Sequence, residues 1–444
     1  MKPIKWALIA VLIFFSSLWW ITEQPDWVGL NGVFGVRPIL LQYTGILAIS
    51  VMSFAMILAN RPVWLEPYLG GLDKMYRLHK WLGITALTLA TTHWLWVNAP
   101  KWLVDMGLLV RPPRGPKPPL EPGSWQQLLQ SQRDLAEGIG EWTFYAIVAI
   151  LLIALVKRFS YRIFTKTHIL MAVAYLALVF HAVILIKFDY WGEVLGVIMA
   201  ALLLAGTISA LRILFGRVGA DRRTSGKVVG ITPNPVMGTV ALDIKLNGGW
   251  KGHEAGQFAF LTLNKVEGPH PFTITSAWQQ DNAIQFIIKG LGDYTQTLAN
   301  SVQVGDVVTV EGPYGCFTFQ SSNKRQIWVG GGIGITPFIS RLKTLAQQTD
   351  GKTIDLFHST ATYDEQALGL LERDANKAHV NLHVLWSQRD GYLTAERIIK
   401  QIPQWRDADI WFCGPSGFGE ALKRDFMALG LPADAFHQEL FEMR

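Results

Sequence analysis

The fold is decided by two apolar stretches, HKWLGITALTLATTH at residues 79–93 and HILMAVAYLALVFH at residues 168–181. Each stretch begins and ends in histidine, with thirteen residues between the two histidines of the first and twelve between those of the second. As helices that rise about 1.5 Å per residue, both would span roughly 20 Å, much of a hydrocarbon core about 30 Å thick. Ionisable groups inside a membrane are costly and usually functional, and facing imidazoles on neighbouring helices suit bis-histidine ligation of a cofactor iron. The pattern predicts two stacked hemes that form an electron path across a bilayer.

The composition divides the chain into two unlike halves. Half of its 444 residues are hydrophobic, but residues 1–216 carry the long apolar runs, whereas the remainder is typical of a soluble α/β protein. The net charge of +6 is modest, and lysine and arginine cluster beside the apolar runs, which indicates membrane topology rather than nucleic-acid binding. With only two cysteines, Cys316 and Cys413, a disulfide framework and a cysteine-rich iron–sulfur motif are excluded.

Six membrane spans are expected. They lie near residues 5–22, 38–59, 79–97, 141–156, 168–187 and 192–215. No small-residue cleavage pattern follows the first, so we expect an uncleaved span rather than a signal peptide. Basic residues gather at the N-terminus and after the second, fourth and sixth spans, and the positive-inside rule places these segments in the cytoplasm. The loop at 98–140 also carries basic residues, on the outer side, but it is long and has acidic residues of its own.

This topology also predicts how the histidines pair. The third and fifth spans run in the same direction, so His79 should face His168 around an inner heme, and His93 should face His181 around an outer heme. At about 100° per residue, the two histidines of the fifth span lie roughly 140° apart, so that span would need tilt, a local distortion or a long reach of the imidazoles. The alternative is four core histidines bonded to backbone carbonyls or to each other. Two near-equal spacings at matching depths favour ligation.

The region from residue 226 to about 319 contains short β-rich segments separated by turns, which is typical of a small antiparallel barrel. Two motifs stand within it, HPFTITS at 270–276 and KGLGDYT at 289–295. An aromatic side chain flanked by hydroxyls can pack on a flavin ring, and glycines before Thr295 at a helix start offer N–H groups to a pyrophosphate. The segment is therefore a candidate flavin site.

A stronger signal follows the barrel. The strand pattern QIWV at 326–329 leads directly into GGGIGITPF at 330–338 and an amphipathic helix, the arrangement of a phosphate cradle at the carboxyl edge of a parallel sheet. Further strand patterns alternate with helices, as a doubly wound nucleotide domain requires; they lie at 353–358, 381–386 and 409–413. The last ends in Cys413-Gly414-Pro415, at the edge where ligands bind.

In order and combination, these motifs resemble the NADPH oxidase and ferric reductase superfamily. The paired-histidine spans, HPFTITS, IKGLGDYT, EGPYG, GGGIGITPF and CGP follow one another as in that family, over essentially the whole chain, and the soluble half resembles ferredoxin–NADP reductases. The resemblance implies a multidomain membrane protein. It would have an all-α six-helix heme-binding transmembrane bundle at 1–216, an antiparallel β-barrel FAD domain at 217–322 and an α/β doubly wound NAD(P)H-binding domain at 323–444.

The resemblance also implies an NAD(P)H oxidase or ferric-chelate reductase in the plasma (inner) membrane, with the FAD and NAD(P)H domains in the cytoplasm. Electrons would pass from NADPH or NADH through FAD and two b-type hemes to dioxygen or a ferric chelate outside. A membrane redox relay that feeds a periplasmic protein partner is the alternative. A transporter whose histidines relay protons is a further hypothesis, but it leaves the flavin motifs unexplained. Nucleic acid is not an expected partner, and the oligomeric state is open.

Carried over residue by residue, the resemblance assigns the site. Heme iron would be held by His79, His93, His168 and His181. The FAD would be bound by His270, Pro271, Phe272, Thr273, Ser276, Lys289, Gly292 and Thr295. The nicotinamide nucleotide would be bound by Gly330, Gly331, Gly332, Gly334, Thr336 and Pro337, with Cys413, Gly414 and Pro415 near its nicotinamide. Catalytic roles are expected for Cys413 and for Phe441, the candidate for a C-terminal aromatic placed over the flavin.

One stretch departs from the family pattern. After Phe357 the chain reads HSTATYDE and lacks the arginine that grips the 2′-phosphate of NADPH in many relatives. Ser359 and Arg389 are the candidates for that contact, so the choice between NADPH and NADH stays open. No EF-hand loop is present, so we expect no calcium control within this chain.

Overall fold

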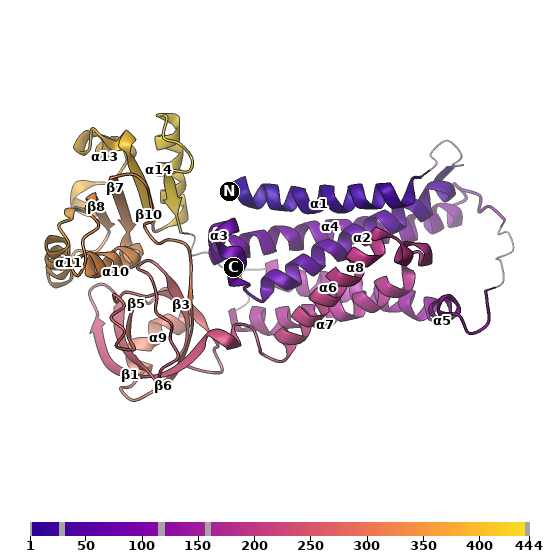
Figure 1. The fold of residues 1–444 in the computed structure, drawn as a ribbon, viewed down its shortest axis with the longest axis horizontal. Coiled ribbons are helices and arrows are strands. Elements are labelled where there is room, and N and C mark those ends of the chain that lie inside the picture. The colour runs from indigo at the N-terminus through magenta and orange to yellow at the C-terminus, as the bar shows by residue number, and fades with distance from the viewer. Residues whose placement is uncertain (1, 26–31, 114–119, 156–160, 440–444) are drawn as a thin grey trace. The chain divides into compact units, whose positions relative to one another are not determined.

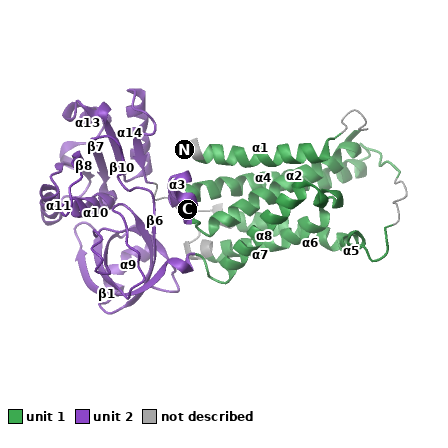
Figure 2. Ribbon diagram, in the orientation of Figure 1, with its two compact units in different colours: residues 1–62, 74–218 green, residues 63–73, 219–444 purple. Residues whose placement is uncertain are grey.

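The computed structural model describes residues 2–25, 32–113, 120–155 and 161–439 (Figure 1). They form two compact units, one made of residues 1–62 and 74–218 and the other of residues 63–73 and 219–444 (Figure 2). The first unit is helical, and the second contains two sheets. The predicted boundaries between the three domains stay predictions.

The helical unit is built from long helices that run side by side (Figure 1). They are α1 (Lys2–Glu23), α2 (Gly32–Ala59), α4 (Leu72–Asp105), α6 (Arg133–Leu155), α7 (Tyr161–Leu185) and α8 (Val194–Leu214), with the shorter α5 (Trp125–Ser131) and η2 (Phe188–Gly192) between them. Five of them, α1, α2, α6, α7 and α8, are long and apolar enough to cross a membrane. The expectation of a multi-pass membrane protein is confirmed.

Helix α4 covers the third predicted span but is not among those five candidates. Asp73, Lys74, Arg77 and Lys80 lie near its start and Lys101 near its end, so much of this 34-residue helix is less apolar than its neighbours. That α4 crosses the membrane therefore stays a prediction.

Helix α2 lies at the centre of the helical unit. Of its most apolar window, 61% is buried, against 17% in α1 and in α6. The buried cluster around it joins α1, α2, α7 and α8 through side chains such as Phe15, Ile46, Tyr175 and Met199. Because lipid is as apolar as these side chains, close packing rather than the hydrophobic effect holds such helices together.

The first sheet of the second unit is an antiparallel barrel. Its strands are β1 (Arg223–Asn234), β2 (Thr239–Leu246), β3 (Phe258–Thr262), β4 (His270–Thr273), β5 (Ala283–Lys289) and β6 (Val307–Tyr314), in the order β4-β3-β6-β1-β2-β5. A bridge between Ile274 and Phe286 links the two outer strands and closes the sheet. In β2 and β5 alternate residues are buried, as a sheet with one core-facing side requires. The barrel fold is confirmed; β4 was expected only as a motif, not as a strand.

The second sheet is parallel, with β7 (Arg325–Gly331), β8 (Thr353–Thr360), β9 (Asn381–Trp386), β10 (Ala408–Cys413) and β11 (Phe436–Gln438) in the order β11-β10-β7-β8-β9. Residues of β7 and β10 are buried almost continuously, because helices cover both faces. One face packs on α10 (Thr336–Leu345) and α11 (Glu365–Lys377), and the other on α13 (Ala395–Gln401) and α14 (Ser416–Ala428). The doubly wound fold is confirmed, with β11 as an additional strand.

Candidate functional site

The four predicted heme ligands form two pairs between α4 and α7. The ring centroids of His79 and His168 are 6.0 Å apart, and those of His93 and His181 are 6.4 Å apart. We call them the inner pair (His79, His168) and the outer pair (His93, His181), after the predicted topology. Helix α7 is continuous from Tyr161 to Leu185, so both pairs form without a break in this helix.

These separations fit an iron between the rings. Two imidazoles that bind a metal from opposite sides, each through a bond of about 2 Å with roughly 1 Å more to the ring centre, have centroids about 6 Å apart. If the rings were merely packed against each other without a metal, nothing would require nearly the same separation in both pairs. The donor set and the distances therefore fit a six-coordinate heme at each pair.

The δ nitrogens of three of these histidines are engaged by the protein. His79 Nδ1 donates to the Ala55 carbonyl at 2.9 Å, and His181 Nδ1 donates to the Ala136 carbonyl at 2.7 Å. The Thr44 hydroxyl donates to the Leu40 carbonyl, so it accepts from His93 Nδ1, 3.1 Å away. A bond at Nδ1 fixes the tautomer with a lone pair on Nε2 and orients the ring for a metal. The carbonyl bonds of the alternative hypothesis are thus present but leave Nε2 available for ligation.

Glycines make room for the outer pair. A Cβ on Gly140 of α6 would lie 2.1 Å from His181 Nδ1, and a Cβ on Gly45 of α2 would lie 3.3 Å from His93 Cε1. Any larger side chain at position 140 must displace the imidazole. Thr44, Gly45 and Gly140 were missed from the sequence, because nothing local marks a small residue that faces a histidine on another helix.

The barrel brings several predicted flavin residues together. His270, Pro271, Phe272 and Thr273 form β4, and the His270 ring stacks on Tyr294 at a centroid distance of 4.8 Å. Burial lowers the pKa of His270, which the nearby Glu267 carboxylate opposes, and burial raises the pKa of Tyr294 to about 12. An uncharged aromatic group on one barrel edge is a suitable wall for a planar ring. Tyr294 lies inside the KGLGDYT motif but was not singled out.

Thr295 acts at the start of α9 (Asp293–Ser301). Its hydroxyl accepts from the N–H groups of Leu291 and Gly292, both at 3.0 Å, and donates to the Gly292 carbonyl. Its hydroxyl therefore stabilises the glycine turn after Lys289, at the end of β5. Phosphate binding at this turn would fall to the remaining backbone N–H groups.

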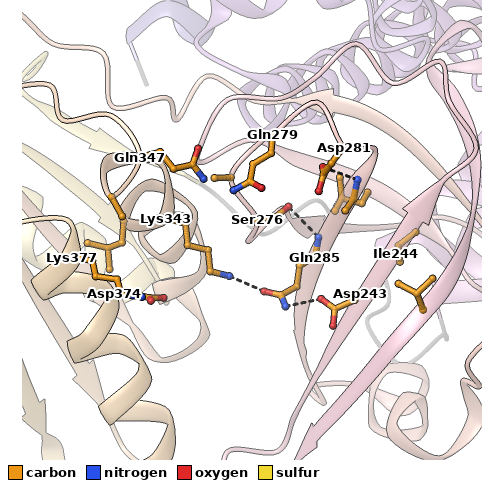
Figure 3. Close-up of a pocket in the computed structure, with 16 residues that line it drawn as sticks. Asp243, Ile244, Ser276, Gln279, Asp281, Gln285, Lys343, Gln347, Asp374 and Lys377 are labelled. Atoms are coloured by element: carbon orange, nitrogen blue, oxygen red, sulfur yellow. Dashed lines mark hydrogen bonds between the residues drawn. The ribbon is translucent and has the colours of Figure 1, made fainter.

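Ser276 stands apart from the other predicted flavin residues. It lines a cavity of about 500 Å³ between the barrel and α10, which the other candidates do not line (Figure 3). Lys343 Nζ donates to Gln285 Oε1 and Gln285 Nε2 donates to Asp243, both at 2.8 Å, across this cavity. The Ser276 carbonyl accepts from Ser340 on α10 at 2.9 Å. In this structure Ser276 joins the barrel to the nucleotide domain.

The glycine-rich turn and the Cys413-Gly414-Pro415 turn meet at the carboxyl edge of the parallel sheet. Gly330 pairs with Cys413 between β7 and β10, the point at which the strand order reverses. A Cβ on Gly334 would lie 2.2 Å from the Cys413 carbonyl oxygen, so only glycine allows this approach. Gly332 lies in η4 (Gly332–Ile335), and Thr336 and Pro337 open α10. Ligands bind at such switch points, and the turn fits a dinucleotide.

Cys413 is fully buried at this edge. Burial raises the pKa of its thiol well above the ordinary value, and the neighbouring Glu439 carboxylate acts in the same direction. Both influences disfavour the thiolate form of Cys413, and its catalytic role stays a prediction. Glu439 is also buried and lies beside Gly315, just after β6; no motif in the sequence marks it. Phe441, the other catalytic candidate, lies outside the described residues.

The candidates for a 2′-phosphate contact differ in their surroundings. Arg389 in α12 (Ser387–Asp390) is exposed and forms two hydrogen bonds with Asp390, at 2.8 Å and 3.0 Å. Ser359 lies one residue before the end of β8, next to His358, whose pKa burial lowers to about 4. A phosphate would have to compete with Asp390 for Arg389.

Three consecutive segments match known protein families. Residues 44–179 match the ferric reductase like transmembrane component, residues 231–318 an FAD-binding domain and residues 328–424 an oxidoreductase NAD-binding domain. The matches follow the order of the helical unit, the barrel and the parallel sheet.

Individual relatives match parts of the chain. A flavohemoprotein of Oceanobacillus iheyensis is 27% identical over 162 residues, 34% of this chain and 40% of its own. Flavohemoprotein A of Dictyostelium discoideum is 32% identical over 158 residues, 34% of this chain and 39% of its own. The chain thus spans about two fifths of these relatives. Among solved structures, an Amycolatopsis cytochrome P450 reductase is similar with a TM-score of 0.44 and 19% identity, over 50% of this chain and 70% of that one.

Proposed function

We propose that this chain, which belongs to the NADPH oxidase and ferric reductase superfamily, reduces dioxygen or a ferric chelate outside the membrane at the expense of NAD(P)H. It combines a ferric reductase-like transmembrane component with FAD-binding and NAD-binding oxidoreductase domains, so its class of function is transmembrane electron transfer that depends on NAD(P)H and FAD. The products of the two proposed reactions are superoxide and ferrous iron.

The observation that carries the proposal is the pair of centroid distances, 6.0 Å and 6.4 Å, between histidines of the same two helices. In bound form, FAD would accept a hydride and release single electrons, and two b-type hemes would carry single electrons toward the acceptor. The four histidines would hold the irons, and Thr44, Ala55 and Ala136 would orient three of them.

The protein supplies positions rather than acids or bases. The turn at Gly330–Gly334 would bind the phosphates of the nucleotide. Gly414 would let the nicotinamide approach, because a Cβ at that position would lie only 3.0 Å from Gly331 Cα. The β4 edge with His270 and Phe272 would bound the flavin. Because burial disfavours its thiolate form, Cys413 would not attack the bound cofactors as a nucleophile.

We further propose that the FAD and NAD(P)H domains lie in the cytoplasm and the chain in the plasma (inner) membrane, with α4 as its sixth span. The basic segments that flank the spans support this orientation. The chain contains its own reporter, because Cys316 is exposed and Cys413 is buried. A membrane-impermeant maleimide should label Cys316 in inverted vesicles and spare it in intact cells. Labelling in intact cells would reverse the orientation.

The acceptor is tested by anaerobic reduction of the purified protein with NADPH, followed by reoxidation with oxygen or a ferric chelate in separate samples. We expect the heme bands to appear on reduction. Faster reoxidation by oxygen with superoxide release identifies an oxidase, and fast reoxidation only by the chelate identifies a ferric reductase. Hemes that reduce but respond to neither acceptor would contradict both and favour a protein partner.

A further inference from the structure

The segment between α2 and α4 packs as part of the FAD- and nucleotide-binding unit. Residues 63–73 belong to this second unit, although α2 and most of α4 belong to the helical unit. The segment contains η1 (Val63–Leu65) and α3 (Glu66–Leu69), and it continues directly into the helix that carries His79 and His93.

Glu66 is the centre of that attachment. Its Oε2 accepts a 2.9 Å hydrogen bond from the Gly315 N–H, across 249 residues of sequence, and the residue is only 4% exposed. Gly315 ends the EGPYG segment and lies beside Glu439 at the candidate active site. Glu66 Oε1 is buried and has no hydrogen-bond partner among the described residues. If Glu66 were ionised, this buried oxygen would carry charge without a hydrogen bond. Protonation removes the charge and so lowers the free-energy cost of burying the group.

The turn after Glu66 fits the same contact. The N–H groups of Gly70 and Gly71 both donate to the Glu66 carbonyl, at 2.7 Å and 2.9 Å. Gly71 has φ 118° and approaches the barrel so closely that a Cβ there would lie 3.5 Å from the Cys316 backbone nitrogen and 2.6 Å from Asp73 Oδ1. The backbone thus holds Glu66 against the end of β6.

The charges that face Glu66 oppose one another. Burial is the largest influence and raises its pKa to about 7; the Gly315 N–H and the Arg222 guanidinium lower it, and the Asp73 carboxylate raises it. Arg222 is itself held by a hydrogen bond to the Pro313 carbonyl and lies over the Tyr314 ring. A carboxyl with a docked pKa above its free value takes up a proton on docking. Docking is therefore strongest below the free pKa and weakens as pH rises through about 7.

We propose that Glu66 is a positioning residue, a proton-sensitive latch that holds residues 63–73 against the barrel at Gly315 and, because this segment continues into α4, affects electron transfer to the heme at His79. The inference rests on the proposed function for its role in electron transfer. The latch itself does not depend on which acceptor is used. Acid favours the seated segment, and alkali loosens it.

Hydrogen exchange of the full-length protein tests the latch without any redox readout. After correction for intrinsic exchange rates, protection of peptides covering residues 63–73 and 311–317 should fall roughly tenfold from about pH 6 to about pH 8. Glu66→Gln keeps the acceptor oxygen without the charge, so its protection should stay high and independent of pH. Glu66→Ala should lose protection at both pH values. The exposed carboxyl variant Glu372→Gln is the control and should behave as wild type.

The positioning role is tested by the ratio of two NADPH-driven rates, heme reduction and flavin reduction. In the wild type the heme rate should fall above about pH 7 while the flavin rate does not, and in Glu66→Gln the ratio should be flat. The latch would be overturned if protection in Glu66→Gln depended on pH as in the wild type. It would also be overturned if protection in the wild type did not depend on pH. An unchanged heme rate in Glu66→Ala would overturn the positioning role. Absence of heme would defeat the proposed function but leave the exchange result interpretable.

Discussion

The inner and outer histidine pairs lie on the same two helices with nearly the same ring separation, but different groups hold them. His79 of the inner pair and His181 of the outer pair both donate to backbone carbonyls, those of Ala55 and Ala136, whereas His93 of the outer pair donates to the Thr44 hydroxyl. The outer pair is also packed against glycines of α2 and α6. The two pairs therefore share the spacing of their rings, but the outer pair also depends on the Thr44 hydroxyl and on the small size of Gly45 and Gly140. Outer-shell partners of this kind tune metal affinity and potential.

The largest expected effect separates the pairs directly. His181→Ala should lose the outer heme, so heme per chain halves and acceptor reduction falls at least about a hundredfold. NADPH should still reduce flavin and a redox dye at the wild-type rate. His168→Ala is the matched change in the inner pair, and it should retain an outer heme that NADPH no longer reduces. Heme content and stopped-flow spectra of both variants give the answer; loss of flavin reduction in His181→Ala would contradict electron transfer in series.

A steric change should strike the outer pair alone. Gly140→Ala places a methyl group where His181 Nδ1 lies, so the ring must shift at a cost of about 1–3 kcal/mol. We expect substoichiometric outer heme and an intact inner heme. Gly138→Ala on the same helix is the control, because a Cβ there meets nothing within 4 Å. Equal heme loss in both variants would mean that helix stability, not imidazole position, is responsible.

Removal of the hydroxyl partner should have a smaller effect. Thr44→Val removes the hydroxyl that accepts from His93 Nδ1, so the outer heme should bind about tenfold more weakly and shift in potential. Thr44→Ser keeps the hydroxyl and should restore both properties. A redox titration of the two heme bands measures the shift. If the inner band moves instead, the assignment of the pairs is wrong.

The smallest effect is expected midway between the pairs. The buried Tyr175 of α7 donates to Ser53 Oγ of α2 at 2.8 Å, and Ser53 in turn donates to the Ile49 carbonyl. Tyr175→Phe should lower stability by about 1 kcal/mol without loss of either heme. Thermal unfolding with heme absorbance as the probe measures both. Selective loss of one heme would show that this bond serves a site rather than the helix packing.

The sequence predicted what depends on local periodicity and ordered motifs. Histidine spacing located both pairs, and a strand before GGGIGITPF placed the glycine turn at the carboxyl edge of β7. Contacts between distant segments could not be predicted from local patterns. Thr44 contacts His93, 49 residues away in the sequence, and Glu66 contacts Gly315, 249 residues away. Strands β4 and β11, of four and three residues, are too short to give a periodic signal. For the fifth span the sequence left tilt, a local distortion and long imidazole reach open, and α7 is continuous from Tyr161 to Leu185.

The most direct test of the account is the iron coordination of the purified wild-type protein, measured by heme per chain together with low-temperature electron paramagnetic resonance. Two pairs of imidazoles predict two hemes per chain, both low-spin with histidine on each side, and both reduced by NADPH without oxygen. One heme per chain, or a high-spin iron with an open position, would contradict the central claim that α4 and α7 hold two irons in series.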